Sequence, residues 1–169
     1  MVVIGFNVKP IILYVLVIAL GFVLRAVAGA EIVNVSISSW LLTCTIFLAL
    51  FLALSKRRHE IQVLGDKASG HRTNLMEYSP TFIDQMIAVV TASTVMAYAL
   101  YTTSVETIEK FGTRNLIYTL PFVLYGIFRY LFLVHIRQEG GSPERVLLRD
   151  KPMILNVALY LVVTFIILY

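Results

Sequence analysis

The chain has 169 residues, of which 59% are hydrophobic and 14% are charged, and its mean hydropathy is +0.83. Soluble domains carry about 25% charged residues, so this composition excludes a soluble globular domain and indicates a membrane protein. The net charge of +4 and the pI near 9.3 are explained by the positive-inside bias of membrane proteins, without nucleic acid as a partner. The single cysteine, Cys44, excludes an intramolecular disulfide and a thiol metal cluster.

Five apolar runs are long enough to cross a bilayer and predict an all-α fold, a polytopic membrane helical bundle that forms one transmembrane domain over residues 1–169. The first run is too long for the apolar core of a signal peptide, so we interpret it as a span. Ser79-Pro80 predicts a helix start, an N-cap followed by proline. A mixed-charge turn is expected over residues 104–115. The predicted spans are 10–29, 37–54, 82–103, 116–136 and 152–169.

Successive loops between these spans lie on alternate sides of the membrane, and the basic residues are concentrated in the loops of one side. Ten lie on one side, whereas only Lys110 and Arg114 lie on the other. Because positive loops stay in the cytoplasm, we expect a multi-pass protein of the cell membrane with a cytoplasmic polar loop at residues 56–79 and the C-terminus outside. The ten are Lys9, Lys56, Arg57, Arg58, Lys67, Arg72, Arg137, Arg145, Arg149 and Lys151.

Two further arginines, Arg25 and Arg129, lie inside predicted spans. An arginine at the membrane centre costs about 2.5–3.5 kcal/mol on insertion scales, so such residues face the bundle interior or extend toward the interface. For Arg25 the alternatives are an extended side chain, a structural ion pair or a functional role. For Arg129, between Tyr125 and Tyr130, they are packing and the lining of a site.

The cluster Lys56-Arg57-Arg58 follows the second span directly. On its own it is typical of a stop-transfer anchor, but its composition also suits a diphosphate or a phosphosugar, because Arg binds phosphate in a bidentate manner and Lys acts as a point charge. If the helix continues inward, Lys56 and Glu60 become i,i+4 neighbours. A pure anchor needs neither that neighbour nor the polar residues that follow, His71, Arg72, Tyr78 and Asp84.

The residues that could bind a metal are scattered along the chain. The three histidines form no i,i+4 pair, and the aspartates form no Asp-x-x-x-Asp pair. Magnesium needs only one or two protein carboxylates together with substrate phosphates, so Glu60 or Asp84 remains a candidate ligand. The sequence contains no P-loop, no Rossmann glycine fingerprint and no nucleophile elbow.

Four segments, in the order in which they occur along the chain, resemble those of a known family. They are residues 20–29 (LGFVLRAVAG), 55–60 (SKRRHE), His71-Arg72 followed by Tyr78, and 140–150 (GGSPERVLLRD). Together they resemble the UbiA prenyltransferase superfamily, and within it the decaprenyl-phosphate phosphoribosyltransferase branch. The resemblance covers nearly the whole chain but only the back half of a nine-helix fold, helices five to nine. The magnesium-binding Asp-rich motif of the family belongs to the front half.

The resemblance implies a reaction in cell-wall biosynthesis. A polyprenyl phosphate oxygen attacks the anomeric carbon of 5-phosphoribosyl diphosphate, and magnesium-bound diphosphate leaves. The segment Lys56 to Glu60 stands where prenyl-diphosphate members carry a second Asp-rich motif, and cationic contacts there suit a donor with phosphates at both ends. The implied catalytic residues are Glu60 and Asp84. The implied substrate-binding residues are Lys56, Arg57, Arg58, His59, Arg72, Tyr78 and Arg129.

The implied cofactor is Mg²⁺, and the implied partners are phosphoribosyl diphosphate, polyprenyl (decaprenyl) phosphate and membrane lipid. We expect activity to require an N-terminal half that another chain would supply. The alternatives are a non-catalytic remnant or membrane assembly subunit, and a UbiA-type prenyltransferase with an aromatic acceptor. A carrier of phosphorylated solutes is disfavoured, because the sequence shows no internal repeat.

Overall fold

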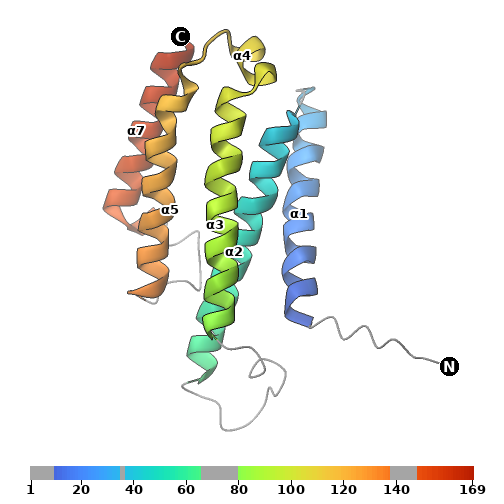
Figure 1. The fold of residues 1–169 in the computed structure, drawn as a ribbon, viewed down its shortest axis with the longest axis vertical. Coiled ribbons are helices and arrows are strands. Elements are labelled where there is room, and N and C mark those ends of the chain that lie inside the picture. The colour runs from blue at the N-terminus through green and yellow to red at the C-terminus, as the bar shows by residue number, and fades with distance from the viewer. Residues whose placement is uncertain (1–9, 35–36, 66–79, 138–147) are drawn as a thin grey trace, which may run out of the picture.

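The computed structural model describes residues 10–34, 37–65, 80–137 and 148–169. Within these ranges every regular element is helical (Figure 1). Five stretches are long and apolar enough to cross a membrane, which confirms the predicted all-α bundle. The elements are α1 (Pro10–Ile32), α2 (Ser39–Gly65), α3 (Pro80–Thr103), α4 (Val105–Phe111), the 3-10 helix η1 (Asn115–Thr119), α5 (Leu120–His135) and α7 (Lys151–Leu168).

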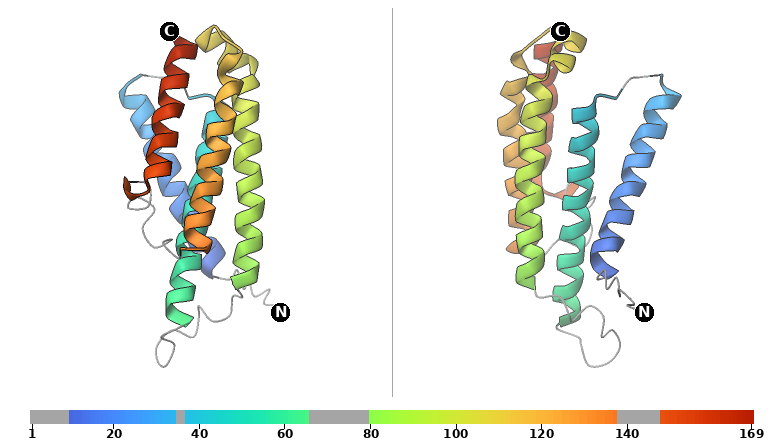
Figure 2. Two further views of the ribbon diagram at one scale, coloured as in Figure 1. Left: turned by 90° about the vertical axis from the view of Figure 1, so that its left-hand side faces the viewer. Right: turned by 45° about the vertical axis from the view of Figure 1, so that its right-hand side comes forward.

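The long helices stand side by side, with α2 between α1 and α3, and with α5 between α3 and α7 (Figures 1 and 2). The two outer helices have few neighbours, because α1 packs on α2 whereas α7 packs on α5 and η1. Only 11% of the residues in the α1 and α7 spans are buried, against 28% in each of the other three. The bundle is therefore well packed at its centre and open at both edges.

The core lies along the seam where α2, α3 and α5 meet. Leu54, Ile83 and Leu133 are fully buried there, and the rings of Phe51 and Tyr130 lie 5.3 Å apart between centroids. Threonine hydroxyls inside the spans bond to carbonyls of their own helix, as Thr94 Oγ1 does to the Val90 oxygen at 2.8 Å. Such internal bonds satisfy polar groups where no water is present.

Local signals set several helix ends. At the start of α7 the Asp150 carboxylate accepts a bond from the Met153 amide, and Pro152 occupies the first turn. The predicted turn at residues 104–115 is wrong in part, because α4 forms there. Ser104 caps its first turn, and Gly112 ends it in the left-handed region at φ 68°. An L-residue with a side chain would be strained at that φ, whereas glycine is not.

Candidate functional site

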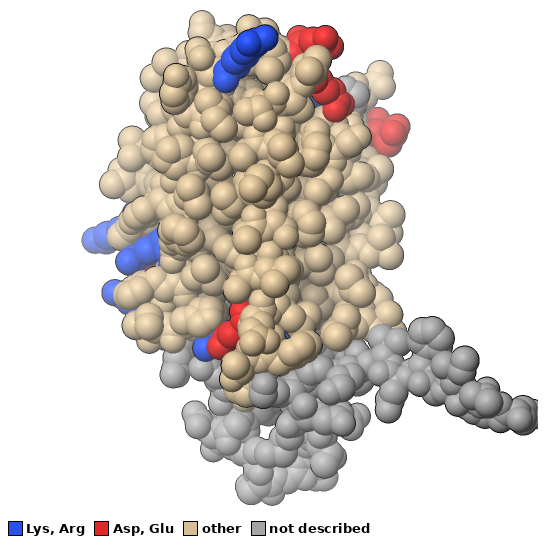
Figure 3. Space-filling view, in the orientation of Figure 1, with Lys and Arg blue, Asp and Glu red and all other residues tan. Residues whose placement is uncertain are grey.

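The ends of α2 and α5 and the starts of α3 and α7 lie at one end of the bundle (Figure 1), and these segments carry many of the charged residues. The described part of Lys56–Asp84, the end of α5 and the start of α7 all lie there, whereas Lys110 and Arg114 lie at the α4 end. In the space-filling view, Lys and Arg lie on the left in the lower half and beside an acidic group near the lower edge, and others lie at the top beside acidic groups, with a broad uncharged surface between (Figure 3). The structure thus brings most of the predicted cationic residues to one end.

Arg57 connects α2 to α1. Its guanidinium donates to the Tyr14 hydroxyl at 3.1 Å and stacks over the Tyr14 ring, with 4.4 Å to the centroid. The same guanidinium forms an ion pair with Glu60, one turn further along α2. The buried Arg57 Nε has no hydrogen-bond partner among the described residues. Arg57 is therefore held in place between α1 and its own helix.

Arg58 faces the opposite way, into the α2–α3–α5 seam. Its side chain is 10% exposed and forms a two-point contact with the Asp84 carboxylate of α3. The His135 Nε2 of α5 lies 3.3 Å from the same Asp84 oxygen, and His135 Nδ1 lies 3.0 Å from the Leu131 carbonyl. One carboxylate thus joins the ends of three helices.

Arg129 and Asp150 form a second two-point pair, between α5 and the start of α7. The Nε–Oδ1 and terminal N–Oδ2 distances are 3.0 and 2.8 Å, and the Asp150 side chain is 7% exposed. The hydrogen bonds from Arg129 hold the pKa of the Asp150 carboxyl below its ordinary value, against the opposing effect of burial, and the Met153 amide acts in the same direction as Arg129. In this chain Arg129 is thus engaged in an ion pair.

The remaining predicted site residues differ in their surroundings. Lys56 is exposed, and the structure shows no contact of its ammonium group with any described residue. His59 is half-buried, and its Nδ1 has no hydrogen-bond partner among the described residues. Arg72 and Tyr78 lie outside the described residues, as does the predicted N-cap Ser79.

The carboxylates proposed for magnesium are both engaged by arginines, Glu60 by Arg57 and Asp84 by Arg58. Across the described ranges, no three His, Cys, Asp or Glu side chains lie close enough together to hold a metal ion. The described donor set therefore does not fit Mg²⁺ without further ligands. Any metal at this end would need oxygens from a substrate or from a part of the protein that the structure does not describe.

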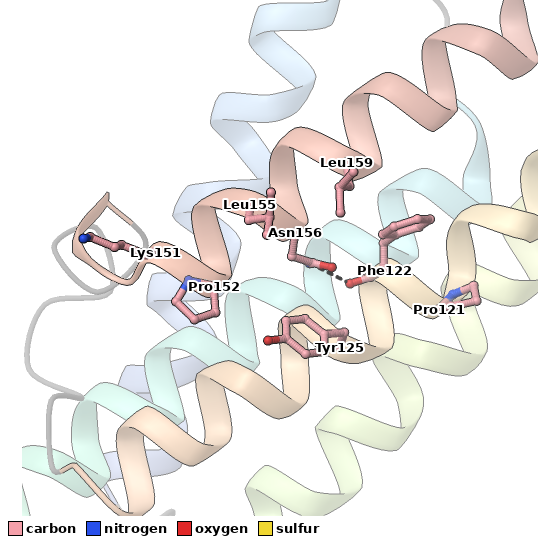
Figure 4. Close-up of a pocket in the computed structure, with 8 residues that line it drawn as sticks. All are labelled: Pro121, Phe122, Tyr125, Lys151, Pro152, Leu155, Asn156 and Leu159. Carbon is pink, nitrogen blue, oxygen red and sulfur yellow. Dashed lines mark hydrogen bonds between the residues drawn. The ribbon is translucent and has the colours of Figure 1, made fainter.

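Two apolar hollows open above the charged end. One, of about 540 Å³, runs between α5 and α7 and is lined by Phe122, Tyr125, Leu155 and Asn156, with Lys151 at its edge (Figure 4). The Asn156 amide donates to the Phe122 carbonyl at 2.9 Å, so its polar end is satisfied within the wall.

The second hollow, of about 270 Å³, separates α2 from α5 and α7. Phe51 of α2, Tyr130 of α5 and Tyr160 of α7 line it, and Asn156 is shared with the first hollow. An elongated apolar group would contact mainly apolar side chains along both walls, and the charged residues, Lys151 among them, would lie at one end of it.

Sequence reasoning missed three residues of this end. Asp150 is a helix N-cap and an ion-pair partner, and its position two residues before a proline is typical of a cap. His135 contacts Asp84, which lies 51 residues earlier in the chain, so no local motif indicates the pair. Tyr14 contacts a residue 43 positions away, a pairing that no local pattern indicates.

Curated proteins of three organisms resemble the chain, and all are named decaprenyl-phosphate phosphoribosyltransferase. The protein from Corynebacterium glutamicum is 32% identical over 148 residues, which are 87% of this chain and 44% of the relative. The Mycolicibacterium smegmatis protein is 24% identical, over 83% of this chain and 46% of the relative. The Mycobacterium tuberculosis protein is 26% identical, over 80% and 43%. No family model matches the chain.

The fold defines a multi-pass helical membrane protein with a charged end and apolar hollows above it. Within that class, the chain is a relative of the decaprenyl-phosphate phosphoribosyltransferases, which confirms the resemblance that the sequence motifs indicated. The chain spans a little under half the length of these relatives, which is consistent with a C-terminal half.

Proposed function

We propose that this chain forms part of a membrane transferase that moves a 5-phosphoribosyl group from phosphoribosyl diphosphate to a polyprenyl phosphate. The observation that carries the proposal is the similarity to proteins of that name over 80–87% of the chain. The described geometry agrees with it, because cations lie at the end of a bundle whose hollows are apolar. Such an arrangement suits two phosphorylated substrates, one of which carries a long hydrocarbon chain.

In this proposal the cations of α2 have different tasks. Lys56 is exposed and binds a donor phosphate directly, and Arg57, held by Tyr14 and Glu60, adds positive charge beside it. Arg58, held by Asp84, supplies fixed positive charge nearby. When the phosphate oxygen of the lipid attacks the anomeric carbon, negative charge develops on the departing diphosphate, and preorganised cations stabilise it. Arg72 and Tyr78 remain predicted donor contacts.

Glu60 and Asp84 are the two carboxylates of α2 and α3 at the charged end. Each contacts an arginine in this chain, so in the proposal they orient the donor-binding cations. Mg²⁺, when bound, would offset the charge of the diphosphate, and its further protein ligands would come from outside the described residues. No residue described here is assigned a proton transfer.

The test uses the full chain co-expressed with the part of the C. glutamicum relative that it does not match. Membranes receive phosphoribosyl diphosphate labelled in the ribose and a polyprenyl phosphate, and labelled lipid is extracted and counted. Lys56→Ala is the informative variant, because Lys56 makes no described contact that folding would need. Loss of one charge-assisted contact, worth about 1.5–3 kcal/mol, should raise the KM for the donor about tenfold or more.

The matched control is Lys110→Ala, a lysine at the opposite end of the bundle. It should leave transfer unchanged, and Arg57→Ala together with Arg58→Ala should abolish it. Unaltered kinetics in Lys56→Ala and in the double variant would reject these residue assignments. If no pairing with the unmatched portion gives labelled lipid, the transferase proposal fails, and a non-catalytic assembly role gains support from the short span of the chain on its relatives.

A further inference from the structure

We propose that the open face of α1 around Arg25 is an interface for a membrane-embedded helix that carries a carboxylate. The occupant would come from the part of the relatives that this chain does not span. The inference deepens the proposed function and rests on it only through the need for that part, not through the transfer reaction.

Arg25 lies deeper than the sequence suggested. The predicted span ended at residue 29, whereas α1 continues to Ile32 and the membrane-length stretch runs from Ile12 to Ile32. Seven residues therefore separate Arg25 from the helix end, about 10 Å at the rise of an α-helix. The side chain is exposed, and within the described ranges its guanidinium contacts only the Phe22 ring of its own helix, at 5.7 Å. A charge at that depth is normally paired or faces a protein interior.

The face that carries Arg25 lets another backbone approach. Gly21 and Gly29 lie one turn to each side of Arg25, and a Cβ built at either glycine meets no atom within 4 Å. Val15 and Ala19 of α1 are buried where the helix packs on α2, and Tyr14, which lies on the Arg25 side of the helix, contacts Arg57 nearer the charged end. The open part of this face is therefore the stretch around Arg25. Small residues at a membrane helix surface permit close helix contact. The open face thus combines room for a helix with a charge that requires a partner.

A second copy of this chain does not satisfy Arg25. In a two-fold contact centred on this face, Arg25 of one copy meets Arg25 of the other, and like charges repel. A contact centred further along could pair Arg25 with Glu31, but it would need antiparallel copies in one membrane, which the ten-to-two distribution of basic residues opposes. The relatives are more than twice as long as the stretch that they share with this chain, and in this proposal their further sequence supplies the helix and its carboxylate.

The first experiment measures association. The full chain is co-expressed with the tagged unmatched portion of the C. glutamicum relative, and recovery on the tag is measured after detergent extraction. The relative's own matched portion is the positive control. We expect Arg25→Leu to reduce recovery at least tenfold, Arg25→Lys to retain part of it and Lys110→Leu to have no effect. Equal recovery with Arg25→Leu, or failure of this chain to associate when the positive control does, overturns the proposal.

The second experiment places a photo-crosslinking residue at position 21 or at Leu20. Leu20 is exposed, and five residues of helix place it roughly 140° around the axis from Arg25. Crosslinks to the tagged portion should form from position 21 and not from Leu20. Crosslinks from position 21 to a second copy of the chain would contradict the proposed occupant. Crosslinks to lipid alone would also contradict it, and would mean that Arg25 extends to the headgroups.

A third readout does not depend on association in detergent. In a single polypeptide that joins the relative's unmatched portion to this chain, Arg25→Leu should lower the melting temperature, whereas in the chain alone it should not. An unchanged melting temperature in the fused protein rejects the interface. Association that depends on Arg25 but gives no transfer would support the interface and reject the proposed function. Transfer that does not depend on Arg25 would support the proposed function and reject the interface.

Discussion

The basic residues at the charged end are of two kinds. Arg58 and Arg129 are each held by a carboxylate of another segment, Asp84 and Asp150, so they contribute to the packing of helix ends. Lys56 has no such contact with a described residue and is exposed. The difference separates variants that change folding from variants that change only binding, and for this reason Lys56 is the better probe of function.

Asp150 should give the chain a pH-dependent stability. Its pKa is lowered in the folded state, so its contribution is complete above the ordinary aspartate pKa of about 3.9 and is lost as the pH falls through the folded value. At pH 7, Asp150→Ala should also lose the helix cap, a loss of about 1 kcal/mol. The melting temperature of wild type should exceed that of Asp150→Asn from pH 7 to pH 5.

Comparing wild type with Asp150→Asn at lower pH tests whether the charge of Asp150 stabilises the fold. The difference in melting temperature between wild type and Asp150→Asn, measured in detergent by circular dichroism, should begin to shrink below about pH 4, because the aspartate then becomes protonated in the unfolded chain, and it should vanish as the pH falls through the lowered pKa of the folded state. Asn retains the ability to cap α7, so a loss of the cap does not confuse the result. A difference that stays constant down to pH 3 would show that the charge of Asp150 does not stabilise the fold.

Asp84 should be energetically coupled to Arg58. Removing one partner of a buried pair costs up to about 3–5 kcal/mol, and we expect about 1–3 kcal/mol for Asp84→Asn because this carboxylate is 35% exposed. Arg58→Met should cost a similar amount. The double variant should cost less than the sum of the two, as measured by thermal melting. Additive losses would mean that the pair does not act as a unit.

At the scale of elements, the sequence predicted the helices better than their ends. Apolar length identified all five spans, because the hydrocarbon thickness sets the number of residues needed. It did not predict that α2 continues to Gly65, since the residues after Leu54 are charged and no longer apolar. That continuation carries Arg57 and Arg58 on one rigid helix. Likewise α4 depends on a capping serine and on Gly112 rather than on an apolar pattern.

The site was predictable in kind but not in its pairings. The cluster at residues 56–58 indicated a cationic site, because charge density can be read along the chain. The sequence did not predict that Arg57 contacts α1 and that Arg58 contacts α3, because these contacts depend on how the three helices pack around each other. Local motifs contain no information about partners that lie 26 or 43 residues away.

Because α5 and α7 are in contact, the effect of replacing Gly126 of α5 on the melting temperature should depend on Asn156 of α7. A Cβ at Gly126 would lie 3.3 Å from Nδ2 of Asn156, which is held by its bond to the Phe122 carbonyl. Gly126→Ala should therefore lower the melting temperature, although alanine in a helix usually gains about 0.5–1 kcal/mol over glycine. In an Asn156→Ala background the same change should raise it.

Gly21→Ala is the matched control for that pair, because the position has open space around it. In the chain alone it should raise the melting temperature slightly, as helix propensity predicts. If Gly126→Ala behaves like Gly21→Ala with Asn156 present, the close approach of α5 and α7 is not a constraint. The test thus examines the wall that the two hollows share.

In the molecule as a whole, the two open edges and the charged end both bear on the proposed function. The outer helices α1 and α7 are the least buried, and the relatives contain as much sequence again outside the matched region. A donor that carries several negative charges does not cross a bilayer unaided, so the charged end is useful only if it faces the compartment that holds the donor. Orientation is therefore the property on which the proposed chemistry depends.

We expect the charged end to face the cytoplasm, and labelling of single cysteines tests this. In a Cys44→Ser background, Glu109→Cys on α4 and Arg137→Cys after α5 place exposed thiols at opposite ends of the bundle. A membrane-impermeant maleimide should label Glu109→Cys in intact cells and Arg137→Cys only after permeabilisation, because the side with ten basic residues is retained inside. The background without cysteine should stay unlabelled. The reverse pattern would put the cationic end outside, where the proposed transfer would not meet its donor.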